Sequence, residues 1–409
     1  MCAVGALCAR RIFSPVCPAC RHDLAEKDME IIAYILGIAL IVIVLVDAFE
    51  TVVLPRRVTR RVRLVRIFYR MTWPVWSRLS GVFASPKTQE TFLSYYGPLS
   101  LPVLLCFWAV VLVFGFSFLY WAPGDAIKTP EHIITFGACI YFSGTTFFTL
   151  GLGDVAPNSA FARVLIVLQA GMGFAFLAIV ISYLPALNQS FARREINISL
   201  LDARAGSPPS ALEILRRHSM GHAIDALTGL LYEWERWSAE LLESHLSYPV
   251  LVYFRSQHDN QSWLAALTSI LDTCAFVITN LEGESVRQAQ LTFAMARHAI
   301  VDLALVLHTP PQELRIDRLP QEDLEALRSF LDKEALRLKT GKDSEQRLAE
   351  LRRMYEPYVY ALSLRLRLAL PYWIPEMSRT DNWQMSAWGK SEGFRQRPAG
   401  EKRRDRGHF

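Results

Sequence analysis

Three apolar stretches in the first half of the chain are long enough to cross a membrane. Residues 97–121 carry no charge, residues 160–187 contain one charged residue, Arg163, and residues 30–54 are apolar apart from acids near both ends. A helix of about 20 residues spans the ~30 Å hydrocarbon core of a bilayer. The pattern therefore predicts three membrane spans.

The second half of the chain has a different pattern, in which charged and apolar residues alternate at the spacing of amphipathic helices. Ser210 and Glu213 form a capping box, which marks a helix start. About 180 residues of this kind can bury a core of their own. We therefore predict a cytoplasmic, all-helical domain over residues 188–372. Its helices are expected at residues 211–246, 259–280, 284–308, 321–338 and 343–369.

A short helix and a glycine-bearing segment are predicted between the second and third spans. Thr129-Pro130-Glu131 has the composition of a helix start, and the helix would run to about Phe148 with its negative dipole end toward the next segment. There, Gly151 and Gly153 permit positive φ, so alternate peptides can rotate and turn successive carbonyls to one side. Rings of such carbonyls can replace the water shell of a cation, and a closed ring requires several copies of the chain.

The segment Thr149-Leu150-Gly151-Leu152-Gly153-Asp154 resembles the Thr-x-Gly-Tyr-Gly-Asp filter signature of the potassium channel pore-domain family, in its bacterial type. The resemblance covers residues 97–187 and implies an outer helix, pore helix, filter and inner helix, here with an extra N-terminal span. Leu152 stands where tyrosine is usual, and Phe148 where a second threonine is common. The implied filter residues are Thr149, Leu150, Gly151, Leu152 and Gly153, and the implied filter supports are Asp154, Tyr141 and Thr145.

The same resemblance implies a function. It predicts a homotetrameric channel that passes K⁺ passively, is not an enzyme and needs no cofactor besides the permeant ion. Because Leu152 and Phe148 alter the surroundings of the filter, a weakly selective cation channel stays open as an alternative. A second alternative is a membrane-anchored helical sensor in which the pore is vestigial.

The third span contains residues that suit a gate. Glycine weakens a helix and lets helices approach closely, proline removes a backbone donor, and a ring of apolar side chains can close a pore by expelling water. Glycine and proline are also frequent in membrane helices without such a role. The predicted hinge and gate residues are Gly171, Gly173, Ile181, Leu184 and Pro185.

Basic residues predict the orientation of the spans. The connection at residues 55–96 is rich in arginine, and such loops stay on the cytoplasmic side. The N-terminus and the filter then lie outside, and the C-terminal domain is cytoplasmic, in a multi-pass protein of the cell membrane. Arginines at every third position from Arg57 to Arg66 are also typical of a voltage sensor. Only one span precedes them, however, and further arginines make the stretch too polar to cross a membrane.

We expect the same connection to lie on the inner leaflet. Phe68, Tyr69, Trp73 and Trp76 would form the apolar side of an amphipathic helix that anionic lipids hold. The lipid bilayer and its anionic inner-leaflet lipids are therefore predicted partners.

Acidic residues near the end of the first span allow two interpretations. Asp47 and Glu50 either pair with the arginines that follow or are solvated at the membrane interface. We favour the pairing.

Both ends of the chain are predicted to be disordered. Residues 1–29 form a leader that contains Cys17 and Cys20 without further zinc ligands or a redox fold, and residues 373–409 form a basic tail. The net charge of +5 is mostly arginine of the connection and the tail, so nucleic-acid binding is not implied. An apolar fraction of 52%, with charge outside the spans, is typical of a membrane protein with a soluble part.

The partner of the helical domain is an unknown cytoplasmic ligand. No Gly-x-Gly-x-x-Gly nucleotide motif occurs in this part of the sequence. His245, His258 and Asp259 lack the further groups expected of a metal or catalytic site.

Overall fold

The computed structural model describes residues 18–53, 64–219, 224–258, 260–333 and 338–374. Two compact units make up the chain, and each is described by itself. The first unit comprises residues 1–49 and 104–181, and the second comprises residues 50–103 and 182–409. Two helices, α4 and α6, contribute residues to both units.

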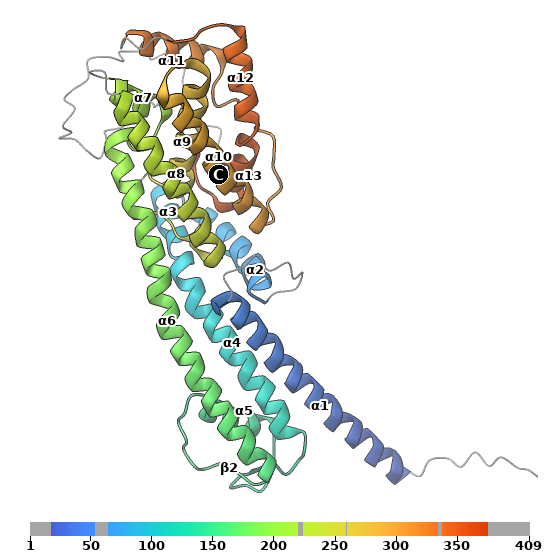
Figure 1. Cartoon of the computed structure of the whole chain (residues 1–409). Helices are drawn as coiled ribbons and strands as arrows, with labels where there is room; N and C mark the ends of the chain where they lie inside the picture. The colour runs from blue at the N-terminus through green and yellow to red at the C-terminus, as the bar shows by residue number, and fades with distance from the viewer. Residues whose placement is uncertain (1–17, 54–63, 220–223, 259, 334–337, 375–409) are drawn as a thin grey trace, which may run out of the picture. The chain divides into compact units, whose positions relative to one another are not determined.

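The first unit is built from helices and one short strand pair (Figure 1). The strands β1 (Ile127–Lys128) and β2 (Ala156–Pro157) pair antiparallel, with Ile127 opposite Pro157. A π-helical turn, η1, follows α1 at Phe49–Val53, and only its first residue belongs to the first unit. The helices are α1 (Pro18–Ala48), α4 (Tyr96–Trp121), α5 (Phe136–Phe147) and α6 (Ala160–Ala205).

Helix α1 packs closely on α4 within the first unit. A Cβ added to Gly37 would lie 2.7 Å from the backbone oxygen of Gly115, so only glycine fits at this crossing. Nearby, the Asp47 carboxylate accepts a hydrogen bond from Trp108 Nε1 at 3.1 Å. Small residues at helix crossings and buried polar contacts are how membrane helices associate. The extra N-terminal span therefore belongs to the same packed unit as the helices of the predicted pore.

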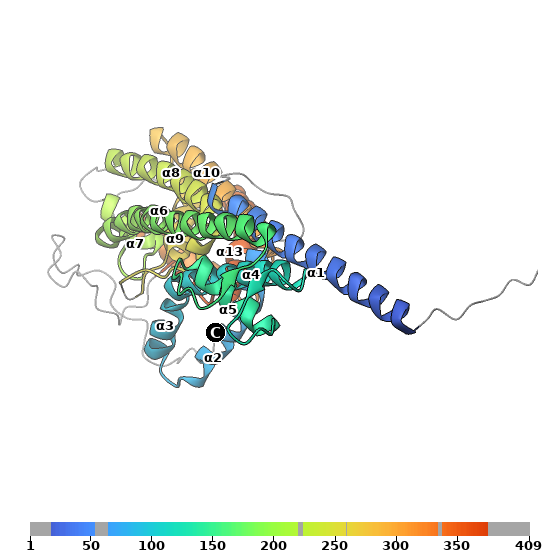
Figure 2. The ribbon, with the colours of Figure 1, turned by 90° about the horizontal axis from the view of Figure 1, so that it is seen from below.

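The second unit is a helical bundle around one apolar core. Helices α8 and α10 run side by side (Figures 1 and 2), and α9 packs against both. Short 3₁₀ turns occur at Ser80–Val82 and at Pro249–Tyr253 (η4). The helices are α2 (Leu64–Leu79), α3 (Pro86–Ser94), α7 (Ala211–Ser219), α8 (Ile224–Ser247), α9 (Trp263–Asn280), α10 (Glu284–Val306), α11 (Gln321–Lys333), α12 (Lys342–Arg353) and α13 (Glu356–Leu366).

Five helices in the described residues are long and apolar enough to cross a membrane: α1, α3 with α4, α6, α9 and α10. Three of them contain the spans predicted from the sequence. Helix α9 is different, because 94% of its most apolar stretch is buried inside the second unit. A helix that is apolar on every side is buried either in lipid or in a protein core. For α9 the packing against α7, α8, α10 and α12 favours the core.

The helical periodicity predicted most of the second unit. The segment expected at 211–246 contains α7 and α8, and the segment expected at 343–369 contains α12 and α13. The second of these breaks where Pro357 enters the first turn of α13. The seven-residue spacing of Leu348 and Tyr355 fits either a coiled-coil seam or a buried helix face, and both side chains are buried in the core of the unit. Plain core packing is therefore the correct interpretation of their spacing.

Four predicted boundaries are wrong. The expected disordered tail does not begin at residue 373, because Trp373 lies in the core of the second unit, and residues 375–409 lie outside the described residues. Helix α1 begins at Pro18, so residues 18–29 of the expected disordered leader are helical, while residues 1–17 lie outside the described residues. Helix α5 begins at Phe136 because the hydroxyl of Thr135 accepts a hydrogen bond from the Ala138 amide at 3.1 Å and caps it. The expected cap at 129–131 lies in the turn before it. Helix α6 does not end near Pro185 but continues to Ala205.

The aromatic side of the connection does not face outward as expected. Trp73 is 5% exposed, and its Nε1 donates to the backbone oxygen of Arg365 at 2.8 Å. Trp76 donates to the backbone oxygen of Phe92 at 3.2 Å. These residues anchor α2 to the second unit, because buried indoles find hydrogen-bond partners in the protein. The arginines from Arg56 to Arg63 lie outside the described residues.

Candidate ion-conduction site

The segment after α5 has an alternating backbone conformation. Thr149, Gly151 and Gly153 have φ values of 55°, 56° and 80°, whereas Leu150 and Leu152 between them do not have positive φ. The predicted positive φ of both glycines is confirmed. The left-handed conformation of Thr149 was not predicted, since β-branched residues rarely adopt it.

The end of α5 explains the conformation of Thr149. The amide of Thr149 donates to the oxygen of Thr146 at 3.0 Å, and the amide of Leu150 donates to the oxygen of Thr145 at 2.8 Å. This pair of bonds, with a left-handed residue between helix and exit, is a Schellman motif. Helix α5 therefore passes directly into the predicted filter, and the backbone oxygen of Thr145 accepts one of these two bonds.

The backbone oxygens of residues 149–153 accept no hydrogen bond from any residue that the structure describes. The side chains of Leu150 and Leu152 are 61% and 63% exposed in the single chain. Unpaired carbonyls in a segment that also exposes leucine are free to coordinate a cation. The C-terminal end of α5 adds the negative end of a helix dipole beside them.

Asp154 is held by the pore helix. The hydroxyl of Tyr141 in α5 donates to Asp154 Oδ2 at 2.8 Å. These are the two residues that the resemblance pairs as filter supports, and the structure brings them together. The bond links the middle of α5 to the residue that follows the filter.

A buried polar network, missed in the sequence, joins three helices. The side-chain amide of Gln169 in α6 donates to the backbone oxygen of Ser143 in α5 at 3.0 Å and contacts its hydroxyl oxygen at 2.6 Å. Gln169 also accepts from the Tyr120 hydroxyl at 2.9 Å, and the Ser143 hydroxyl donates to the oxygen of Val113 at 2.8 Å. Tyr120 and Val113 belong to α4. The signal in the sequence was one amide in the otherwise apolar stretch 164–181.

Gly173 lies one turn after Gln169 and contacts the last residue of α5. A Cβ added to Gly173 would collide with the backbone oxygen of Phe147, whereas a Cβ on Gly171 would meet nothing within 4 Å. Gln169 and Gly173 are four residues apart on α6, and their partners Ser143 and Phe147 are four residues apart on α5. They form the contact line between inner helix and pore helix, called here the inner-helix seam.

The remaining predicted gate residues also lie in α6. Ile181 is 65% exposed in the first unit, and Leu184, in the second unit, is 39% exposed. Pro185 lies inside the helix. The two predicted glycines thus differ, because Gly173 is required by packing and Gly171 has open space around it.

Residues 182–205 of α6, called here the extension of α6, belong to the second unit and are anchored there through Arg194. The buried guanidinium of Arg194 donates to the backbone oxygens of Leu251 at 2.9 Å and Phe254 at 2.7 Å. The backbone oxygen of Arg194 accepts a hydrogen bond from Trp237 Nε1 at 3.3 Å. His245 lies 3.3 Å from the guanidinium. Burial, with Arg194 beside it, lowers the pKa of His245 to about 3, so the ring is neutral and its Nδ1 donates to the oxygen of Leu241 at 2.7 Å.

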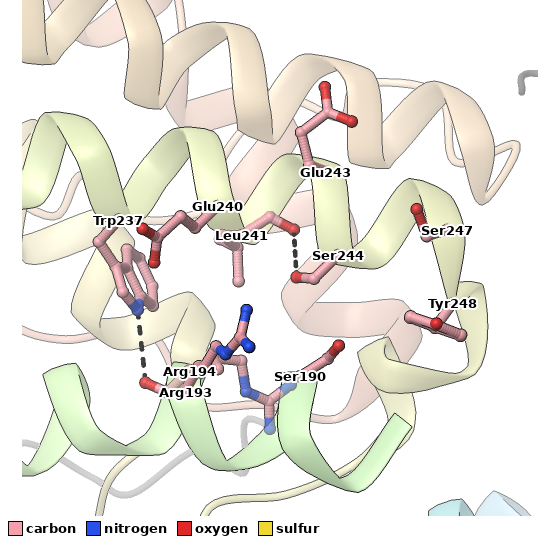
Figure 3. A pocket seen from close by; sticks show the side chains of 10 residues that line it. All are labelled: Ser190, Arg193, Arg194, Trp237, Glu240, Leu241, Glu243, Ser244, Ser247 and Tyr248. Atoms are coloured by element: carbon pink, nitrogen blue, oxygen red, sulfur yellow. Dashed lines mark hydrogen bonds between the residues drawn. The ribbon is translucent and has the colours of Figure 1, made fainter. Parts of the chain in front are cut away.

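A cavity of about 300 Å³ lies beside this contact, between α6 and α8 (Figure 3). Among the described residues, no group of three or more His, Cys, Asp and Glu side chains is placed to hold a metal ion. His258 is exposed, and Asp259 lies outside the described residues. The residues that line the cavity include Ser190 and Arg193 from α6, and Trp237, Glu240, Ser244 and Tyr248 from α8 and its end.

Comparison with known proteins bears on the first unit and on the part of α6 that follows it in the chain. Residues 103–189 match the model of a family described as "Ion channel". This part of the chain is an ion channel domain. The domain begins in α4, contains α5 and the segment 149–153, and ends in α6. The predicted resemblance to a channel pore and the predicted helical membrane fold are confirmed, and every predicted filter, support and gate residue lies within the ion channel domain.

One relative extends beyond the ion channel domain. The chain is 25% identical over 280 residues to the "Uncharacterized membrane protein YdjJ" of Bacillus subtilis (strain 168), an alignment that covers 64% of this chain and 77% of that protein. No solved structure matches. The chain is a multi-pass membrane protein.

Proposed function

We propose that the chain is the subunit of a homotetrameric, potassium-selective channel that conducts passively. The observation that carries the proposal is the positive φ of Thr149, Gly151 and Gly153, in a segment whose carbonyls accept no hydrogen bond from the part of the chain that the structure describes. The oxygens of Thr149, Leu150, Gly151 and Leu152, with the Thr149 hydroxyl, coordinate the ion. Gly153 completes the turn into Asp154.

Exposed apolar side chains support assembly of several copies. The side chains of Phe148, Leu150 and Leu152 are 61%, 61% and 63% exposed in the single chain. They belong to the segment whose backbone oxygens are proposed to bind the ion. Contiguous exposed apolar side chains mark surfaces that a partner covers. In a ring of four copies, these side chains pack against neighbouring subunits while the backbone faces the axis.

Selectivity is the finer part of the proposal. Potassium selectivity depends on how firmly the carbonyls are held, and the Tyr141–Asp154 bond and the Schellman motif both restrain the filter. Leu152 and Phe148 carry no polar group that could add a further restraint. A weakly selective cation channel is therefore the second candidate.

Gating is proposed to involve α6. Gly171 provides a flexible point, and Ile181, Leu184 and Pro185 lie further along the same helix, where apolar side chains can narrow the passage. Because the inner-helix seam joins α6 to the end of α5, a movement of α6 would displace the end of α5 and the adjoining residue Thr149. The cavity beside Arg194 is the candidate site for the unknown cytoplasmic ligand, since it is lined by the extension of the same helix.

The proposed topology has the N-terminus and filter outside and the helical domain in the cytoplasm. The arginine-rich connection supports this orientation. Anionic lipids of the inner leaflet are its proposed partners.

The proposal is tested by recording single-channel currents from the purified chain in bilayers. With unequal K⁺ and Na⁺ on the two sides, the reversal potential should lie near the potassium equilibrium potential. A value midway between the two ions would favour the weakly selective alternative. Gly151→Ala places a side chain at φ 56°, where the left-handed conformation costs about 1–2 kcal/mol, and it should abolish current. A vestigial pore is indicated if the wild-type protein conducts nothing.

A further inference from the structure

Helix α2 exposes a stripe of apolar side chains on the side opposite its buried aromatic residues. Ile67, Met71, Val75 and Leu79 are 43%, 67%, 55% and 50% exposed. Residues four apart lie on one face of a helix, so the four side chains form one continuous stripe. Val82, in the 3₁₀ turn that follows, is 80% exposed and extends it. We call these residues the α2 stripe.

The opposite face of α2 packs against other residues of the second unit. Trp73 is buried and bonded to the oxygen of Arg365, and the Thr72 hydroxyl lies 2.8 Å from that of Tyr96. Tyr69 stacks on Tyr253 with ring centroids 5.3 Å apart. The orientation of α2 is therefore fixed by packing, and the α2 stripe must face away from the core.

The charged residues of the chain segment that carries the stripe are of one sign. Residues 51–89 contain no Asp or Glu, whereas Arg70 and Arg78 are exposed on α2 itself. An apolar helix face flanked by arginine is the chemistry that binds an anionic bilayer surface. A second copy of the same surface is disfavoured as its partner, because self-association would bring like charges together.

The chain length around α2 keeps it close to the membrane. Ten residues, 54–63, separate η1 from α2, and they can extend at most about 35 Å. On the other side, α3 joins α2 to α4, the second predicted span. The chain on each side of α2 thus leads to a membrane helix in the proposed topology, α1 on one side and α4 on the other.

We propose that the α2 stripe inserts into the interfacial region of an anionic bilayer, with Arg70 and Arg78 beside the lipid headgroups. The proposal rests on the membrane topology proposed above. It assigns the lipid contact to the face opposite the one expected from the aromatic residues. Because Trp73 is part of the core of the second unit, α2 then fastens that unit to the inner leaflet.

The test measures the surroundings of single nitroxide labels on the full-length chain in bilayers that contain phosphatidylglycerol. Cysteines replace Met71 or Val75 in a cysteine-free background, and Thr88, an exposed residue of α3, provides the matched control. Labels at 71 and 75 should be more accessible to oxygen, which partitions into lipid, than to a water-soluble nickel complex. The label at 88 should show the opposite preference.

Two outcomes would overturn the proposal. Labels at 71 and 75 that are as accessible to nickel as the label at 88 would place the stripe in water. Labels inaccessible to both reagents, with spin–spin broadening between copies, would place it in a protein contact. Neither outcome depends on ion current, so failure here is distinct from failure of the channel proposal.

Discussion

The amide nitrogen of Gln169 lies 2.6 Å from the hydroxyl oxygen of Ser143, which joins the inner helix to the pore helix inside the apolar part of the first unit. Both residues are fully buried. In such surroundings an unpaired polar group is costly, so the contact fixes the register of the two helices. Phe147 and Gly173 repeat this relationship one turn further along.

Replacing Gln169 by leucine should weaken the pore. The change leaves the Tyr120 hydroxyl without its acceptor, at a cost of about 1–3 kcal/mol for a buried unsatisfied group, and it removes the hydrogen bonds that α6 makes to Ser143. We expect lower thermal stability of the assembled protein and reduced selectivity, measured by melting in detergent and by reversal potential. Leu168→Met, at the exposed neighbouring position, should change neither. Unaltered selectivity and melting in Gln169→Leu would refute the role of the network.

Alanine at the two glycines of α6 should have different effects. Gly173→Ala forces a methyl group against the Phe147 oxygen and should displace the end of α5, with loss of current or of assembly. Gly171→Ala has open space and gains up to about 1 kcal/mol of helix stability. It should preserve assembly and lower the open probability, if this position bends during gating. The measurements are size-exclusion chromatography and single-channel recording; equal behaviour of the two variants would contradict the packing role of Gly173.

Removal of the Tyr141 hydroxyl should loosen the filter. Tyr141→Phe deletes the hydrogen bond that holds the Asp154 carboxyl against α5. We expect sodium permeability to rise and currents to become less stable with time. Tyr95→Phe, at an exposed tyrosine of the second unit, is the control. The interpretation fails if Tyr141→Phe retains wild-type permeability ratios.

The second unit should lose stability in acid through His245. Its pKa is lowered to about 3 in the folded protein, while an unfolded histidine titrates near 6.5. Between these values the unfolded state binds a proton that the folded state does not, so stability is present above about pH 6.5 and falls as the pH decreases toward 3. The unfolding midpoint of the full chain, measured from pH 7 to pH 4, should fall less steeply in His245→Gln than in wild type. Parallel slopes would show that His245 does not carry the effect.

Much of the fold follows from sequence periodicity, because helices of the second unit bury one face and expose the other. The spacing of apolar residues such as Leu348 and Tyr355 therefore predicts which side chains of a helix are buried. Helix ends were less predictable. Thr135 and Thr129 are equally suited to cap α5, and tertiary packing decides between them. The third span was expected to end near residue 187, but the helix continues through Pro185 to Ala205, because one missing hydrogen bond does not stop a helix that is packed on both sides of it.

The site was predictable where chemistry is local and not where it depends on contacts between helices. Glycine at positions 151 and 153 predicts a positive φ there, since few other residues tolerate that conformation. Thr149 adopts the same conformation only because of how α5 ends. Gln169 and Gly173 could be located in the sequence, but their partners on α5 could not. Likewise, Trp73 suited a lipid surface by composition, and only the fold reveals that it faces the protein.

The most direct test is a density map of the assembled protein in a bilayer mimetic with K⁺ present. We predict four copies of residues 149–153 around one axis, with their backbone oxygens directed at ion density between them. The account is contradicted if this segment is buried against side chains of its own or a neighbouring subunit, away from any shared central passage.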